Sequence, residues 1–159
     1  DDVRRMAYKF HPSILDDLGL TAALKHMAEE WSEKTGIRIV IVGEEMADPL
    51  PRDVASCLYR VTQESLANIM KHARATRVEL ELICDGQEIT LSIQDTGVGF
   101  DLKNAQAGHS GLGLVNMRER VRSVQGRFDI QSEPGRGTHI MVHIPFSGAP
   151  HEETTSYLG

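Results

Sequence analysis

The stretch TRVELELICDGQEITLSIQD, Thr76 to Asp95, decides the fold class, because apolar and polar residues alternate through both of its halves. Residues at every second position of a strand lie on the same face of a sheet. The set predicted to face the core is Val78, Leu80, Leu82, Cys84, Ile89, Leu91 and Ile93. Asp85 and Gly86, between the halves, are typical of a tight turn. The stretch is therefore predicted to form an antiparallel hairpin.

Two amphipathic helices are predicted before this hairpin, from Leu20 to a capping Gly36 and from Pro51 to about Ala73. Apolar residues recur in both at the three- and four-residue spacing of a helical face. These residues are Leu20, Leu24, Met27, Trp31, Val54, Leu58, Val61 and Ile69. The β-branched run from Ile37 to Val42 predicts a strand between the two helices.

The sequence after the hairpin predicts a long loop, a helix and a second hairpin. The loop from Phe100 to Ser110 has no apolar period, and loops of this length in compact domains are often lids. The helix is predicted from Gly113 to a capping Gly126, and the hairpin turns at EPGRG, Glu133 to Gly137. The fold class predicted is α+β, a two-layer sandwich with helices on one face of a mixed, largely antiparallel sheet.

Composition limits the class of protein. The chain has 159 residues, which suits one domain, and a formal net charge of −6 without a block of Lys or Arg. Nucleic-acid surfaces need clustered cations, so no direct nucleic-acid partner is predicted. Cys57 and Cys84 fall at apolar positions and form no CxxC pair, so both are interpreted as buried hydrophobes in a reducing compartment. No apolar run is long enough for a membrane span, and a cytoplasmic location is expected.

The long helix carries the first polar cluster. Glu64, Asn68 and Lys71 are spaced i, i+4 and i+7, so a regular helix places them on one face, with His72 beside them. Their oxygens and ammonium group could hold a hydrated Mg²⁺ ion and phosphates. Taken alone, a solvated stripe with a Glu–Lys pair explains the same spacing.

Two glycine clusters follow. Asp95 continues the inward alternation of the second strand, so its carboxylate is predicted to face a pocket, and Gly97 and Gly99 allow a flat ligand to approach the backbone. Gly111 and Gly113 open a helix, whose free N–H groups suit a phosphate. The alternatives are an ordinary turn at a strand end and an ordinary joint between a loop and a helix.

Taken in order, these clusters resemble the ATP-binding catalytic domain of sensor histidine kinases, in the superfamily shared with type II topoisomerases, Hsp90 chaperones and mismatch-repair ATPases. The four boxes that carry the resemblance are Glu64 to Ala73, Asp95 to Gly99, Gly111 to Leu114 and Gly135 to Thr138. It covers about residues 20 to 146 and implies the two-layer fold with ATP between the long helix, the lid and the sheet. FHPSILDDLGLTAAL and GLGLVNMRERV resemble the subfamily that signals to response regulators with LuxR-type helix-turn-helix output domains.

The resemblance implies a role for each residue that matches a box. Asn68 would coordinate Mg²⁺ with support from Glu64, and Lys71 and His72 would lie near the phosphates. Asp95 would accept a hydrogen bond from the adenine amino group. The remaining implied contacts to ATP are Gly97 and Gly99 beside the base, Gly111, Leu112, Gly113 and Leu114 over the triphosphate, and Thr138 in the adenine pocket.

The implied activity is transfer of the γ-phosphate of Mg-ATP to a histidine of the protein's own dimerisation domain, in a homodimer, for relay to a response regulator. In the family an acidic residue follows this histidine, and the segment before Leu20 holds no such pair. The phosphoacceptor is therefore expected upstream of Asp1, and anchoring of the whole protein in a membrane is left open. A catalytically silent nucleotide-binding module and a serine kinase of the anti-sigma-factor type are the alternative functions.

Residues 1–19 are predicted to be the end of the dimerisation helix and a linker, 20–146 the ATP-binding domain, and 147–159 a loose tail. His11 precedes Pro12, which is expected to end the first helix. His11 is therefore interpreted as a hinge residue and not as the phosphoacceptor.

Overall fold

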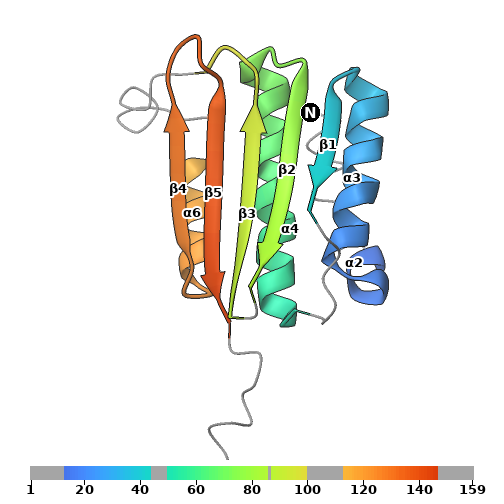
Figure 1. Ribbon diagram of the computed structural model, residues 1–159, viewed down its shortest axis with the longest axis vertical. Helices are drawn as coiled ribbons and strands as arrows, with labels where there is room; N and C mark the ends of the chain where they lie inside the picture. The colour runs from blue at the N-terminus through green and yellow to red at the C-terminus, as the bar shows by residue number, and fades with distance from the viewer. Residues whose placement is uncertain (1–12, 44–49, 86, 100–112, 147–159) are drawn as a thin grey trace, which may run out of the picture.

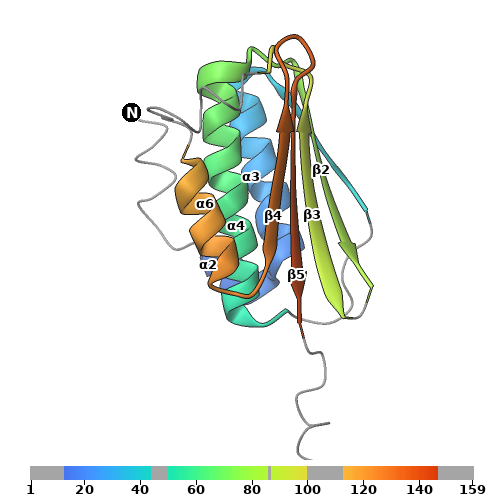
Figure 2. The same ribbon diagram turned by 90° about the vertical axis from the view of Figure 1, so that its left-hand side faces the viewer.

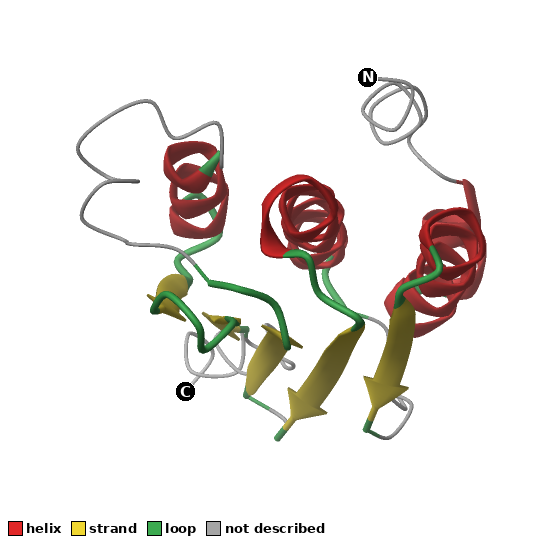
Figure 3. Ribbon diagram, turned by 90° about the horizontal axis from the view of Figure 1, so that it is seen from above, coloured by secondary structure: helices red, strands yellow, loops and turns green. Residues whose placement is uncertain are grey.

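The computed structural model describes residues 13–43, 50–85, 87–99 and 113–146. In this part of the chain, one five-stranded sheet forms a layer and the helices form a second layer on one of its faces (Figures 1, 2 and 3). In chain order the elements are α2 (Ser13–Leu18), α3 (Leu20–Thr35), β1 (Arg38–Val42), α4 (Arg52–Asn68), the π-helical turn η1 (Ile69–Ala73), β2 (Arg77–Cys84), β3 (Glu88–Asp95), α6 (Leu114–Arg122), β4 (Arg127–Ser132) and β5 (Thr138–Pro145).

The strands lie in the order β1-β2-β3-β5-β4. β1 pairs with β2 in parallel, and every other neighbouring pair is antiparallel. The predicted α+β sandwich with a mixed, largely antiparallel sheet is confirmed. The predicted hairpin is also present, and Asp85 closes its turn by accepting hydrogen bonds from the backbone N–H groups of Gln87 and Glu88, at 3.1 and 2.8 Å.

The core lies between the helices and the covered face of the sheet. Figure 3 shows these two layers end-on. All eight helical positions predicted to be apolar and inward are buried, as are six of the seven strand positions. The exception is Cys84, which is exposed, so its interpretation as a buried residue is wrong. β1 pairs with β2 only as far as Glu81, so the end of β2 has a neighbouring strand on one side alone. Cys57 is buried as predicted.

Two helix ends differ from the prediction. The helix of Pro51 to Ala73 is α-helical only to Asn68 and continues as the π turn η1. After α6 the left-handed residue is Gln125, with φ 59°, and Gly126 is not the left-handed cap. Gln125 and Gly126 donate their N–H groups to the carbonyls of Arg122 and Val121, the pattern of a Schellman motif. Gly126 is still needed, since an added Cβ would lie 2.7 Å from Cγ1 of Val121.

The short helix α2 was not predicted, because Gly19 separates it from α3 and six residues show little periodicity. Its Leu15 is buried in the same core as α3 and α4. Outside the described residues lie the predicted first helix with Pro12 at its expected end, the predicted lid and the predicted tail. The predicted domain boundaries therefore stay predictions. No helix in the described ranges combines the length and the apolar character that a bilayer crossing requires.

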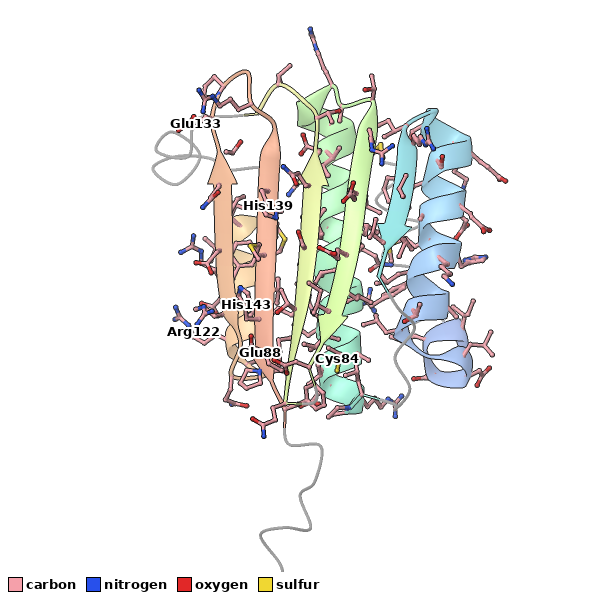
Figure 4. The ribbon with its side chains drawn as sticks, viewed as in Figure 1. Cys84, Glu88, Arg122, Glu133, His139 and His143 are labelled. Atoms are coloured by element: carbon pink, nitrogen blue, oxygen red, sulfur yellow. The ribbon has the colours of Figure 1, made fainter. Side chains whose placement is uncertain are left out.

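The other face of the sheet carries polar side chains and no helix from the described part of the chain (Figures 2 and 4). Two histidines of β5 make contacts with β3 on this face (Figure 4). His139 Nε2 lies 2.7 Å from Ser92 Oγ, and His143 Nδ1 lies 3.1 Å from Thr90 Oγ1 and 3.5 Å from Glu88 Oε1. Because they are on the open face, these histidines do not belong to the candidate site below.

Candidate functional site

The candidate site begins with one row of side chains that crosses the covered face of the sheet. Ile39, Val78, Asp95, Thr138 and Ser132 occupy aligned positions on the five strands, from one edge to the other. The row is apolar on β1 and β2 and polar on β3, β5 and β4. Its three polar members are all buried. Buried polar groups need hydrogen-bond partners, so this end of the sheet is organised around them.

Asp95, at the last position of β3, is 4% exposed, as its place in the alternation predicts. Its Oδ1 accepts the N–H of Gly97 at 2.6 Å, and its carboxyl group also accepts the backbone N–H of Thr138. Burial raises the pKa of Asp95 above the ordinary 3.8, and these two hydrogen bonds oppose that rise. The backbone thus fixes the carboxylate and leaves it further lone pairs for a donor.

Glycines bring three backbone segments together around Asp95. Gly99 has φ 68°, and a Cβ on it would collide with the carbonyl oxygen of Glu133. Gly137 has φ 74°, and a Cβ there would collide with the backbone carbonyl of Asp95. Gly135 donates its N–H to the carbonyl of Val98 at 2.5 Å. The turn between β4 and β5 therefore packs against the segment after β3, and a side chain at either collision point would separate them.

Ser132 is a buried residue of this site that sequence reasoning missed. Its Oγ donates to the carbonyl of Gly137 at 3.1 Å and lies 2.8 Å from Oγ1 of Thr138. The available signal was its place in the alternation of β4, where Phe128, Ile130 and Ser132 share one face. A serine at the end of a strand is common, so the pattern did not mark it as functional.

The second part of the site joins α4 to the start of α6. A Cβ on Gly113 would collide with Oε1 of Glu64, so the Glu64 carboxylate lies directly against the residue that precedes α6. A carboxylate is stabilised at the positive end of a helix. Gly113 has φ 65°, a left-handed conformation that favours glycine. Leu114 follows and is buried in the core.

Glu64 and Asn68 are both half-buried, whereas Lys71 is exposed on η1. A π turn contains more residues than an α turn, so Lys71 does not take the position of a regular i+7 residue. The assumption of one regular helical face therefore holds for Glu64 and Asn68 and not for Lys71. The backbone of His72 lies in η1, and its side chain, together with Gly111 and Leu112, lies outside the described residues.

Both parts lie toward the same end of the sandwich. The C-terminal end of α4, the end of β3 and the start of β5 are all at the top of Figures 1 and 2. Among the described residues, no three His, Cys, Asp or Glu side chains are placed to hold a metal ion together. Glu64 and Asn68 still offer a carboxylate and an amide oxygen, which suit Mg²⁺ when phosphates and water supply its other ligands. The donor set therefore fits a metal held jointly with a phosphate ligand.

Comparison with known proteins agrees with the fold and gives the family. Residues 53–148 match the family model of the histidine kinase-, DNA gyrase B- and HSP90-like ATPases. The chain is 37% identical over 147 residues to the sensor histidine kinase MctS of Rhizobium johnstonii, an alignment that covers 92% of this chain and 32% of MctS. The chain thus spans about a third of the length of this relative.

Two solved structures share the fold. A histidine kinase domain from the blue-light activated histidine kinase of Erythrobacter litoralis EL346 superposes with a TM-score of 0.67 at 21% identity, over 85% of this chain and 63% of that one. A second structure of this kinase gives a TM-score of 0.68 at 22% identity, over 85% and 43% of the two chains. The family match covers more than half of the chain, and the chain therefore belongs to the family of histidine kinase-, DNA gyrase B- and HSP90-like ATPases.

Proposed function

We propose that this chain is the catalytic domain of a sensor histidine kinase, which binds Mg-ATP and transfers its γ-phosphate to a histidine of an upstream dimerisation domain. Family membership implies ATP binding. The similarity to a sensor histidine kinase over 92% of the chain supports the kinase class. The observation that carries the proposal is the buried Asp95 carboxylate, fixed by two backbone N–H groups at the end of the sheet where the glycine segments meet.

In this proposal Asp95 recognises adenine. Its carboxylate accepts a hydrogen bond from the exocyclic amino group, and Thr138 borders the same pocket. Gly97 and Gly99 keep side chains away from the flat base. A base with an oxygen in place of the amino group would leave the buried carboxylate without its donor, so the proposed site favours ATP over such a nucleotide.

The phosphates lie between α4 and α6 in this proposal. Asn68 provides an oxygen to Mg²⁺ with support from Glu64, and Lys71 and His72 neutralise phosphate charge. Gly111, Leu112, Gly113 and Leu114 cover the triphosphate, and the start of α6 contributes its N–H groups. Phosphoryl transfer depends mainly on positioning and on charge stabilisation, which this set of residues is suited to give.

The whole protein is proposed to act as a homodimer. The phosphoacceptor histidine lies on its own dimerisation domain, in a segment before Asp1, and the phosphoryl group passes to a response regulator. The residues of FHPSILDDLGLTAAL and GLGLVNMRERV support a regulator with a LuxR-type helix-turn-helix output domain.

The test uses the full-length protein with γ-labelled ATP and Mg²⁺, followed by acid and base treatment of the labelled product. A phosphohistidine is labile in acid and stable in base, which is the expected result. An acid-stable, base-labile product would instead support a serine kinase of the anti-sigma-factor type. ATP binding without any labelling would support a silent nucleotide-binding module.

Two variants assign the label to this site. Asn68→Ala should reduce labelling at least tenfold through loss of the metal ligand. Gln87→Ala removes an exposed amide side chain at the turn between β2 and β3, at the opposite end of the sheet, and should leave labelling unchanged (Figure 1). Equal labelling in both variants would contradict the role of Asn68.

A further inference from the structure

Ser132 and Thr138 face each other on adjacent strands, with Asp95 on the other side of Thr138. All three side chains are buried, and their exposed fractions are 8% or less. Ser132 belongs to none of the four motifs of the sequence analysis. It touches Thr138, which the proposed function places in the adenine pocket.

The direction of the hydrogen bonds in this group follows from counting protons. Each hydroxyl group has one proton to donate and can accept two hydrogen bonds. The carbonyl of Gly137 can only accept, so the contact of 3.1 Å uses the Ser132 proton. The contact of 2.8 Å between the two hydroxyl oxygens must then use the Thr138 proton. The arrangement that satisfies both contacts runs from Thr138 to Ser132 to the Gly137 carbonyl.

Because its proton is used toward Ser132, the Thr138 hydroxyl can only accept a hydrogen bond from any other partner. Asp95, when ionised, is also an acceptor only. Facing residues on neighbouring antiparallel strands have Cβ atoms about 5 Å apart, so one small group can contact both side chains. An amino group has two N–H donors, one for each of these two adjacent acceptors.

We infer that Ser132 is a specificity-determining residue, because it fixes the Thr138 hydroxyl as an acceptor and so favours a 6-amino purine over a 6-oxo purine. The inference rests on the proposed function and adds a residue to its site. In this inference Asp95 accepts from one N–H of the amino group. Ser132 prevents Thr138 from rotating to donate to a purine oxygen, and so keeps the Thr138 hydroxyl as the acceptor for the other N–H.

The test compares binding of ATP and inosine 5′-triphosphate to this chain by calorimetry with Mg²⁺ present. The inosine nucleotide has an oxygen in place of the 6-amino group and a proton on N1. In Ser132→Ala the Thr138 proton is released and can serve this oxygen. The affinity for ATP divided by the affinity for the inosine nucleotide should therefore fall about five- to tenfold relative to the unaltered chain. This is the scale of one hydrogen bond.

A second background separates this effect from a general change in packing. Thr138→Val keeps the shape of residue 138 and removes its hydroxyl group. Ser132→Ala in that background should leave the ratio of affinities unchanged, since no proton remains to be redirected. Ser92→Ala removes a serine hydroxyl from the open face of β3, where it contacts His139, and should change neither affinity.

Three outcomes would overturn the inference about Ser132. An unchanged ratio in a folded Ser132→Ala variant overturns the inference, as does an equal change in the Thr138→Val background. If the alanine variant does not fold, Ser132→Cys keeps the branching of the side chain, with a slightly larger atom that is a much weaker hydrogen-bonding group, and should lower the ratio in the same direction. Failure of the unaltered chain to bind ATP overturns the proposed function itself and the inference with it.

Discussion

The Oε1 atom of Glu64 occupies the space that a Cβ on Gly113 would take. This relationship links the C-terminal half of α4 to the residue that starts α6, through a position where only glycine leaves room. Gly113 therefore has two separate reasons to be glycine, its φ of 65° and the carboxylate beside it.

Gly113→Ala should lower the free energy of unfolding by more than backbone strain alone. A left-handed conformation costs an alanine about 1–2 kcal/mol, and displacement of Glu64 adds to this cost. We expect a total loss of about 2–3 kcal/mol. Urea denaturation followed by circular dichroism measures it.

Gly36→Ala is the matched control, because Gly36 has φ 78° and no atom within 4 Å of an added Cβ. It should show the strain alone. Glu64→Ala should make the Gly113→Ala loss smaller and leave the Gly36→Ala loss unchanged. Additive effects of Glu64→Ala and Gly113→Ala would show that the carboxylate does not oppose a side chain at position 113.

Asp95→Asn should reduce ATP affinity about a hundredfold while the domain stays folded. The change replaces one carboxylate oxygen with an amide nitrogen, which cannot accept from an amino group. Losing a hydrogen bond to a charged group costs about 1.5–3 kcal/mol. Calorimetry of nucleotide binding, with circular dichroism to establish folding, makes the measurement. Near-normal affinity in a folded variant would remove Asp95 from the proposed adenine pocket.

The pH dependence of stability should carry a signature of Asp95. Burial raises the pKa of Asp95 above 3.8, so the folded chain holds this proton more tightly than the unfolded chain. Stability from this group is therefore present at low pH and is lost as pH rises through the folded pKa. As pH falls from 7 toward 4, the free energy of unfolding of the unaltered chain should increase relative to that of Asp95→Asn.

Asp85 provides the opposite sign for comparison. Hydrogen bonds from the N–H groups of Gln87 and Glu88 lower the pKa of this exposed carboxyl group. Its contribution is present above pH 3.8 and is lost as pH falls through the lowered pKa. On acidification, the free energy of unfolding of the unaltered chain should therefore decrease relative to that of Asp85→Asn. Slopes of the same sign in the two comparisons would contradict the environment described for Asp95.

The two cysteines should differ sharply in reactivity toward a thiol reagent at pH 8. Cys84 is exposed, whereas Cys57 is buried and burial raises its pKa to about 11. The thiolate is the reactive form, so Cys57 should react only when the domain opens. Mass spectrometry of the folded chain should find one rapid modification, which Cys84→Ser abolishes. Rapid modification of both thiols would mean that the α4 face holding Cys57 is accessible.

The sequence predicted the parts of the fold that repeat a simple period. Alternation defined β2 and β3 and placed Asp95 inward, and helical spacing defined the core faces of α3 and α4. Cys84 had the same alternation as Leu82, yet Leu82 is buried and Cys84, at the last position of β2, is exposed. A local period does not contain the place where the covering layer ends.

Other features depend on contacts between distant residues. The π turn after Asn68 follows a helix that is regular in its apolar spacing, so the sequence predicted one continuous helix. Gly126 leaves the room that a Cβ would take beside Val121 and Ile144, whereas the left-handed residue after α6 is Gln125. Ser132 gains its place only when β4 and β5 pair in register with β3.

The parallel pairing of β1 with β2 also determines how the sheet can assemble. β2 with β3, and β4 with β5, are neighbours along the chain and can form as local hairpins, whereas β1 reaches β2 only after α4 has been traversed. Contacts between residues far apart in sequence require a larger loop-closure entropy and form more slowly. We therefore expect β1 and α3 to dock last during folding and the amide hydrogens of β1 to exchange before those of β3 and β5.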